Sequence, residues 1–287
     1  MKELSLSVVI PAFQESQSIA DVIQGVGNIL KPHVKNWEII VVDDGSGDAT
    51  ADEAQTAGAC VLRHPCNQGY GQALETGICA AKHDWILMID ADGSYPAAEI
   101  LKLLEFVPAF DLVIGTRTGA YFWGSPYNAC LRWIYLQISG FIVGQKVPDA
   151  NSGLRLIRKS LLLDPALVKC LGYSYTTTMT LSFIKVGRFV KFVPIKFQAR
   201  AGKSKVRRFR DILRTLQLMT EVLITYNPLK LFSTLALLPA LAALACAAIS
   251  AYCGKGVWLI CAHLNTIAAL LCFVTGCVLD SIRIHAR

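Results

Sequence analysis

The 287-residue chain lacks several patterns that mark common classes of protein. None of its 10 cysteines forms a C-x-x-C pair, so neither a zinc site nor a disulfide framework is indicated. The P-loop signature G-x-x-x-x-G-K-[ST] is absent, which argues against an ATPase or kinase of that class. In "NQGYGQALETG", Leu74 stands where the dinucleotide-binding fingerprint needs its third glycine, which disfavours a Rossmann dehydrogenase.

Charge is missing from two long segments near the C-terminus. Leu231–Cys253 and Gly256–Leu279 contain no Asp, Glu, Lys or Arg, in a chain that is 53% hydrophobic. At about 1.5 Å of rise per residue, each could cross a bilayer core roughly 30 Å thick. We therefore predict an integral membrane protein with two transmembrane helices joined by "CGKG". The N-terminal apolar run is short and contains Pro11, so we expect no signal peptide.

Basic residues predict the orientation of this hairpin. Seven of the residues between Arg200 and Arg214 are Lys or Arg, against the single acid Asp211, and Arg283 and Arg287 follow the second segment. By the positive-inside rule, we expect both termini and the whole N-terminal part to face the cytoplasm. Because the basic cluster adjoins a membrane, anionic lipid or phosphate is a better partner for it than nucleic acid.

Apolar runs alternate with segments of helical period between Leu4 and Gly115, which predicts an α/β fold with a mostly parallel sheet covered on both faces. Asp48 is a suitable N-cap and Gly58 a suitable stop for one of the helices. The expected strands are Leu6–Ile10, Glu38–Val42, Ala59–Leu62, Trp85–Ile89 and Leu112–Ile114. The expected helices are Ser18–Leu30, Ala49–Ala57, Tyr70–Ala81 and Ala97–Phe106.

Two further helices are predicted beside the membrane segments. Pro126–Val143 is rich in aromatic residues and carries one arginine, which is typical of a helix lying at the bilayer interface, although a buried core helix is an alternative. Residues 207–226 are amphipathic and begin with a basic stretch, so they would rest on the cytoplasmic leaflet or pack against the preceding domain. We thus expect a domain over residues 1–205, a juxtamembrane helix over 206–228 and a hairpin over 229–287.

Two pairs of carboxylates follow predicted strands. In "WILMIDADGSYP", Asp90 and Asp92 follow the apolar residues Trp85–Ile89, and residues i and i+2 of a strand share a face. Such a pair suits Mg²⁺ or Mn²⁺ bound together with a nucleoside diphosphate, while a simple turn is the alternative. Asp43 and Asp44 follow another strand, where they would contact a base or a ribose, or form an Asx turn.

These motifs together resemble family 2 glycosyltransferases of the dolichol-phosphate mannose synthase type, from about Val8 to Lys205. The hairpin is similar to that of bacterial undecaprenyl-phosphate glycosyltransferases. The resemblance implies a GT-A fold, a nucleotide-sugar donor and a polyisoprenyl-phosphate acceptor such as undecaprenyl or dolichyl phosphate. It rests on the ordered segments "VVIPAFQE", "EIIVVDDGSGDAT", "NQGYGQA", "DADGSYP", "VIGTR", "DANSGLRLIRK" and "VPIKFQARAGKSK".

The resemblance also implies roles for residues on the donor side. The nucleoside site would contain Pro11, Ala12, Glu15 and Asp44, with Asp43 beside them. The metal and the donor diphosphate would be bound by Asp90 and Asp92, with Ala91 between them. The donor phosphates would be closed over by Arg200 and Lys205.

On the acceptor side, Arg117 and Arg132 correspond to the family's ligands of the acceptor phosphate, and Asp149 to its active-site aspartate. The chain departs from the family at Gln68 and Tyr70, where a basic or small residue is common, and at Gly93-Ser94. These positions would lie near the sugar.

The implied reaction is an inverting, metal-dependent transfer. A lipid phosphate is mostly dianionic at neutral pH and needs no strong base, so Asp149 would position the acceptor or, less simply, act as a base. The alternatives are a related glycosyltransferase with another lipid acceptor, such as a diacylglycerol, and a non-catalytic membrane scaffold. The sequence does not define an oligomeric state, so a homo-oligomer stays open.

Overall fold

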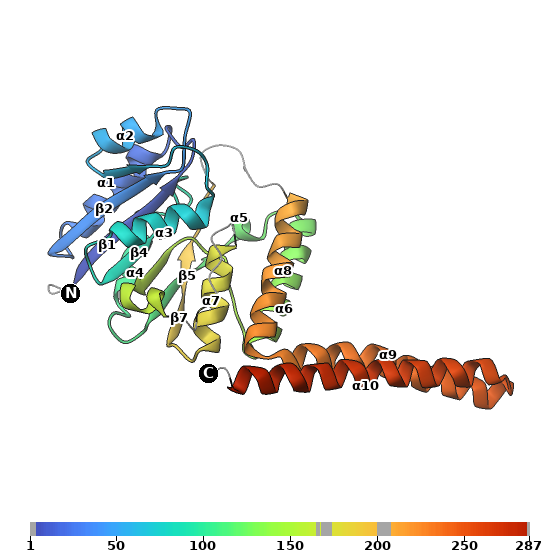
Figure 1. Ribbon diagram of the computed structural model, residues 1–287. Helices are drawn as coiled ribbons and strands as arrows, with labels where there is room; N and C mark the ends of the chain where they lie inside the picture. The colour runs from blue at the N-terminus through green and yellow to red at the C-terminus, as the bar shows by residue number, and fades with distance from the viewer. Residues whose placement is uncertain (1–3, 165–166, 168–173, 200–207, 286–287) are drawn as a thin grey trace. The chain divides into compact units, whose positions relative to one another are not determined.

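The apolar runs of the first 200 residues form one sheet, as their alternation with helical segments predicts. A computed structural model of the chain describes residues 4–164, 167, 174–199 and 208–285. Within these residues, seven strands pair in the order β3-β2-β1-β4-β6-β5-β7 (Figure 1). The strands are β1 (Ser5–Ala12), β2 (Asn36–Asp43), β3 (Cys60–Arg63), β4 (Trp85–Met88), β5 (Leu112–Thr118), β6 (Arg155–Arg158) and β7 (Val190–Lys196).

The sheet is mostly parallel, as predicted. β1 pairs in parallel with β2 and β4, β2 with β3, and β5 with β7. The exception is β6, which runs antiparallel between β4 and β5. The carboxyl ends of β1, β2, β4 and β5 therefore meet at one edge of the sheet, and the loop that enters β6 begins at the same edge.

Apolar side chains on the two faces of the sheet form two separate cores. On β1, Leu6, Val8 and Ile10 pack with α1 (Ile19–Leu30) and α4 (Ile100–Leu104). Val9 points to the other face and packs with α3 (Tyr70–Ala80) and α7 (Tyr175–Lys185). Because both faces are covered, the central strands are apolar at nearly every position. The ligand-accessible part of the sheet is then its carboxyl edge.

The other helices of this part of the chain are short connections, apart from α6. α2 (Thr50–Thr56) joins β2 to β3, and a 3₁₀ turn, η1 (Ala97–Glu99), precedes α4. α5 (Ala120–Trp123) and α6 (Pro126–Val143) follow β5, and η2 (Lys159–Leu163) follows β6. Ser125 caps α6 by accepting a hydrogen bond from the Asn128 N–H at 3.4 Å.

Most predicted elements are present, with changes at their ends. The predicted helix over Pro126–Val143 has the same bounds in the structure. β5 runs to Thr118 rather than Ile114, and β4 ends at Met88, so Asp90 and Asp92 lie in the loop after the strand. The predicted cap Asp48 is one residue early: Ala49 is the N-cap of α2, and Asp48 Oδ1 accepts from the Thr50 N–H at 3.1 Å.

The chain divides into two compact units, Met1–Leu218 and Met219–Arg287, with the boundary inside α8 (Arg208–Tyr226). The second unit contains α9 (Pro228–Cys253) and α10 (Gly256–His285), which pack against each other. The left-handed residue Gly254, at φ +64°, ends α9 and starts the turn between them. Both helices are long and apolar enough to cross a membrane. This agrees with the two predicted spans.

Candidate active site at the carboxyl edge of the sheet

A cavity of about 360 Å³ opens at the carboxyl edge of the sheet. Its walls come from the loops after β4 and before β6, from the end of β5, from the first turns of α3 and α7, and from residues 197–199. The lining includes acidic, basic and aromatic side chains: Asp90, Asp92, Arg117, Tyr70, Tyr95, Tyr121 and Phe197. Three of the predicted site residues, Asp90, Asp92 and Arg117, thus share one cavity.

Asp90 is held between Tyr70 and Gly153. The Tyr70 hydroxyl donates a hydrogen bond to Asp90 Oδ1 at 2.8 Å. Burial, followed by the negative charge of Asp92, raises the pKa of Asp90 to about 6, and the Tyr70 hydrogen bond acts in the opposite direction. A methyl group at Gly153 would lie 2.3 Å from Asp90 Oδ2, so a larger residue would displace this carboxylate from its present position.

Asp92 lies on the same cavity, where Ser94 orients it. Its Oδ1 accepts hydrogen bonds from the Ser94 N–H at 3.0 Å and from the Ser94 hydroxyl at 2.6 Å. These contacts close a tight loop after β4 that keeps the second carboxylate near the first. The two carboxylates therefore reach one cavity, although a loop and not the strand carries them.

The donor set of this pair fits a hard divalent cation. Among the residues that the structure describes, no group of three or more His, Cys, Asp or Glu side chains could hold a metal ion by itself. Mg²⁺ typically binds one or two carboxylates and completes its shell with water and substrate phosphates. Burial and the charge of Asp92 make ionisation of Asp90 costly, and a divalent cation beside both carboxylates would offset part of that cost. Such a cation would take its remaining ligands from water and from a substrate phosphate.

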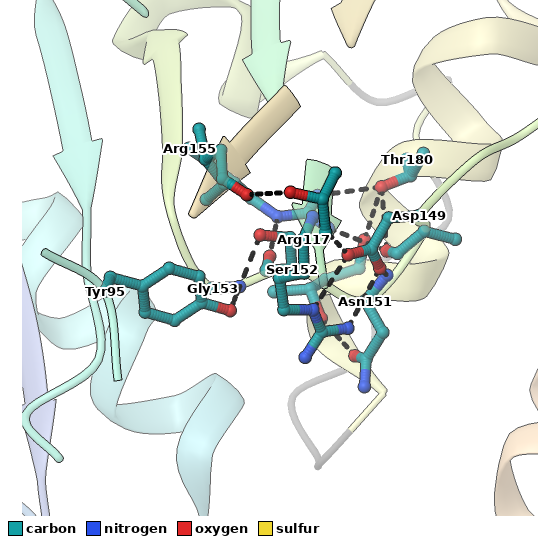
Figure 2. Close-up of polar contacts among 12 residues, drawn as sticks. Tyr95, Arg117, Asp149, Asn151, Ser152, Gly153, Arg155 and Thr180 are labelled. Carbon is teal, nitrogen blue, oxygen red and sulfur yellow. Dashed lines mark hydrogen bonds and ion pairs between the residues drawn. The ribbon is translucent and has the colours of Figure 1, made fainter. Parts of the chain in front are cut away.

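Arg117, which lines the same cavity, forms a bidentate ion pair with Asp149 (Figure 2). Arg117 Nε and a terminal nitrogen donate to Asp149 Oδ2 and Oδ1 at 2.8 and 2.9 Å, and the Arg117 N–H donates to Oδ2 at 3.2 Å. The Asn151 N–H adds a fourth hydrogen bond, at 3.1 Å. Asp149 is 1% exposed. With both oxygens engaged, this carboxylate fixes the direction of Arg117.

The loop between Asp149 and β6 is held by residues that were not among the predicted site residues. Arg155, which is fully buried, donates to the carbonyls of Ser152 and Ala150 at 2.6 and 2.7 Å and to Thr180 Oγ1 at 2.8 Å (Figure 2). The Gly153 N–H donates to the Tyr95 hydroxyl at 2.7 Å. The signal that could have found Arg155 is a cation inside the apolar segment "GLRLI", which must be hydrogen-bonded if it is buried.

A second polar contact joins this loop to α6. Thr176 donates to Asn151 Oδ1 at 2.6 Å, and Thr177 makes a longer contact with the same oxygen at 3.5 Å. The Tyr135 hydroxyl, on α6, lies 2.7 Å from Thr177 Oγ1. The aromatic helix is thereby hydrogen-bonded to the first turn of α7, next to the loop that carries Asp149.

The ends of β1 and β2 hold the predicted nucleoside residues. Pro11 and Ala12 pair with Val42 and Asp43, and the Asp44 N–H donates to the Ala12 carbonyl at 2.8 Å. The Glu15 N–H donates to Thr50 Oγ1 at 2.8 Å. These residues lie at and just after the ends of the neighbouring strands β1 and β2, but they are not among the described residues that line the 360 Å³ cavity.

Asp44 is engaged within the protein. Its Oδ1 lies 2.7 Å from His64 Nδ1 and accepts from the Gln68 N–H at 2.9 Å, and its Oδ2 accepts from the Gly69 N–H at 2.8 Å. Asp43 accepts from the Ser46 N–H at 3.1 Å and lies 3.7 Å from Arg63 Nε. Both acids therefore shape the loops at this edge.

The other basic residues predicted for the site are Arg132, Arg200 and Lys205. Arg132, on α6, lies against the ring of Phe122, with Cζ 4.3 Å from the ring centroid. Arg200 and Lys205 lie outside the residues that the structure describes.

The model of the family described as "Glycosyl transferase family 2" matches residues 7–164. The chain belongs to this family. The match covers the strands and loops that carry Asp43, Asp90, Arg117 and Asp149. The resemblance of the ordered motifs to family 2 glycosyltransferases is thereby confirmed.

Two proteins of similar sequence are named as sugar transferases of dolichyl phosphate or undecaprenyl phosphate. The chain is 28% identical to a dolichyl-phosphate hexose transferase of Haloferax volcanii, over 71% of this chain and 87% of that protein. It is 29% identical to an undecaprenyl-phosphate mannosyltransferase of Micrococcus luteus, over 69% of this chain and 86% of that protein. Glucosyl-3-phosphoglycerate synthase of Mycobacterium tuberculosis, in a complex with Mn²⁺ and UDP-glucose, shares the fold, with a TM-score of 0.60 and 22% identity over 77% of this chain and 80% of that one.

Proposed function

We propose that this family 2 glycosyltransferase transfers a sugar, with inversion, from a nucleotide sugar to a polyisoprenyl phosphate at the cytoplasmic face of a membrane. The observation that carries the proposal is one cavity lined by the carboxylates of Asp90 and Asp92 and by Arg117. The two carboxylates suit a metal-bound diphosphate, and the guanidinium suits a phosphate monoester. The names of the two relatives above support dolichyl or undecaprenyl phosphate as the acceptor.

The acceptor phosphate is its own nucleophile. With a second pKa of about 6, it is mostly dianionic at neutral pH, so no side chain has to remove a proton. The protein must instead hold two anionic substrates in line despite their repulsion. Arg117 and Arg132 would bind the acceptor phosphate. Asp149 would act as a positioning residue, because its two oxygens are bonded to Arg117.

The donor would lie over the ends of β1, β2 and β4. Pro11, Ala12, Glu15 and Asp43 would contact the nucleoside, and Arg200 and Lys205 the phosphates. Asp44 would act through the loop that it holds, because the N–H groups of Gln68 and Gly69 are bonded to it. Tyr70, which follows directly and lines the cavity, would then contact the sugar.

Asp90 and Asp92, with Ala91 between them, would hold Mg²⁺ or Mn²⁺ together with the donor diphosphate. When bound, the cation would neutralise charge on the leaving nucleoside diphosphate. The solved relative with Mn²⁺ and UDP-glucose supports a divalent cation in this fold. Asp90 and Asp92 themselves would set the position of the diphosphate relative to Arg117.

The membrane arrangement completes the proposal. Residues 1–205 would form the catalytic domain, 206–228 a basic helix on the cytoplasmic leaflet, and 229–287 the transmembrane hairpin. α6 would lie at the bilayer interface, because it exposes the large aromatic side chains Tyr127, Trp133 and Phe141. This would bring the lipid phosphate to the cavity without extracting its tail.

The experiment is transfer of radiolabel from a panel of UDP- and GDP-sugars to undecaprenyl and dolichyl phosphate, with full-length protein in detergent and Mg²⁺ or Mn²⁺. We expect a lipid-linked product from one donor. Transfer to diacylglycerol but to neither polyprenyl phosphate would replace the acceptor in this proposal. Folded protein with no lipid product from any donor would refute it.

A further inference from the structure

Phe122 contacts both of the arginines that are proposed to bind the acceptor phosphate. Its side chain is 3% exposed, on the short helix α5 that follows β5. The guanidinium carbon of Arg117 lies 5.2 Å from the centroid of its ring, and that of Arg132 lies 4.3 Å from the same centroid. One aromatic ring is therefore in contact with cations from two elements, β5 and α6.

Neighbouring side chains hold the Phe122 ring and the Arg117 guanidinium in place. Trp123 packs edge-on against Phe122, with 5.2 Å between the ring centroids. Arg117 is bound at its far side by Asp149 and lies 5.5 Å from a second ring, that of Phe197. Phe197 in turn packs edge-on against Tyr95 at 5.3 Å. Arg117 is thus held by the buried side chains of Asp149 and Phe122 and by the partly buried ring of Phe197.

An aromatic ring is suited to this place for a physical reason. Two guanidinium groups repel each other, and neither loses its proton at physiological pH. The negative face of an aromatic ring attracts each of them, whereas an aliphatic side chain of similar size would fill the space without that attraction. Guanidinium N–H groups are in turn preferred donors to phosphate oxygens.

We propose that Phe122 is a positioning residue that holds Arg117 and Arg132 together as one site for a phosphate monoester dianion, the head group of the acceptor. This inference rests on the proposed function and adds a residue to it. Phe122 does not touch the phosphate itself. It acts through the two guanidinium groups.

The test replaces Phe122 in the full-length protein with leucine, with tyrosine, and with phenylalanines that carry one, two or three ring fluorines. Fluorination keeps the shape of the ring and weakens its negative face step by step. The measured quantities are the KM for polyprenyl phosphate, the KM for the nucleotide sugar, kcat and the thermal midpoint. Binding of a short isoprenyl phosphate by calorimetry provides a readout that does not depend on transfer.

We expect the acceptor KM and the calorimetric Kd to rise with each fluorine, by about tenfold for the trifluoro ring, while the donor KM is unchanged. Phe122→Leu should resemble the trifluoro protein, and Phe122→Tyr should restore most of the acceptor affinity. The matched control is the same fluorination of Phe106, whose ring contacts Lys191 at 4.9 Å on another part of the domain. It should change none of these values.

Three results would overturn the inference. One is an acceptor KM that does not change along the fluorine series while the wild-type protein is active, which would leave the proposed function intact. Another is an equal rise of both KM values with a lower thermal midpoint, as expected of a purely structural residue. The third is a wild-type protein that neither binds an isoprenyl phosphate nor transfers sugar to one, which would end the proposed function as well.

Discussion

The two sides of the candidate site hold their charged groups by different means. At the ends of β1 and β2, the carboxylates of Asp43 and Asp44 accept hydrogen bonds mainly from backbone N–H groups of Ser46, Gln68 and Gly69. At the end of β5 and the start of β6, Arg117 is held by a carboxylate and two aromatic rings. Asp43 and Asp44 thus shape loops on the side proposed for the donor, whereas Arg117 and Asp149 lie on the side proposed for the acceptor. We therefore expect substitutions on the two sides to affect different substrates.

The largest effect should come from the acids between the two sides. Asp92→Asn keeps the size of the side chain and removes the charge that would bind the cation. We expect transfer to fall on the order of a hundredfold or more, and a chelator to do the same to the wild-type protein. Glu105→Gln, at an exposed position, is the matched control. Wild-type rates of label transfer in the Asp92 variant or after chelation would contradict the metal site.

Asp149→Asn should affect the acceptor side alone. Without the carboxylate, Arg117 loses its bidentate partner, so we expect the KM for polyprenyl phosphate to rise at least about tenfold while the donor KM stays the same. Because a buried ion pair is broken, the free energy of unfolding should fall by about 3 kcal/mol. Steady-state kinetics and denaturant unfolding measure both. A large fall in kcat with an unchanged acceptor KM would instead indicate a general base.

Asp44→Asn should affect the donor side. The amide cannot accept all the hydrogen bonds that the carboxylate accepts from His64, Gln68 and Gly69, so the loop before α3 should loosen. We expect the KM for the nucleotide sugar to rise about fivefold and the free energy of unfolding to fall by about 2 kcal/mol. The acceptor KM should not change. An equal rise of both KM values would remove the distinction between the two sides.

The smallest effect concerns pH. The pKa of Asp90 is about 6, above the ordinary value of an aspartate, so lowering the pH through 6 should protonate Asp90 and weaken cation binding. Because the Tyr70 hydrogen bond lowers this pKa, Tyr70→Phe should shift the acid limb of the rate profile to higher pH, with little change well above it. Raising the Mn²⁺ concentration should shift the limb back. A profile that coincides with that of the wild type would show that Tyr70 does not influence Asp90.

The same raised pKa affects stability in a defined direction. Between the ordinary pKa of aspartate and 6, the folded chain binds a proton at Asp90 that the unfolded chain does not. This group therefore contributes most to stability below that window, and its contribution is lost as the pH rises through 6. A bound divalent cation should reverse the loss, since it favours the ionised carboxylate.

The sequence predicted the parts of the fold in which local pattern and tertiary role agree. Most residues of β1, β2 and β4 are buried and apolar, so these strands are easily recognised. The missed elements include β6, β7 and α7. β6 has an arginine at each end, and α7 contains four threonines, which are weak helix formers. Thr178 and Thr180 donate to carbonyls one turn earlier, within a buried helix.

The sequence predicted several residues of the site but not the side chains that they contact. Asp90, Asp92 and Arg117 share a cavity, as their places after parallel strands imply. The pairing of Arg117 with Asp149 was not predicted, because it depends on the antiparallel insertion of β6, which brings the loop of Asp149 to that edge. Tyr95 and Arg155 were missed for the same reason: each is defined by a contact with that loop.

Gly153 has a consequence for how this gene can change. Any side chain at this position would lie within 2.3 Å of an Asp90 oxygen, since even a β-carbon does so. Every single-base substitution of a glycine codon that alters the amino acid introduces at least that carbon. Every missense change at this codon therefore requires the Asp90 carboxylate to move. Variation in sugar or lipid preference that keeps this carboxylate in place is expected at other codons, such as those of Gln68, Tyr70 and Ser94.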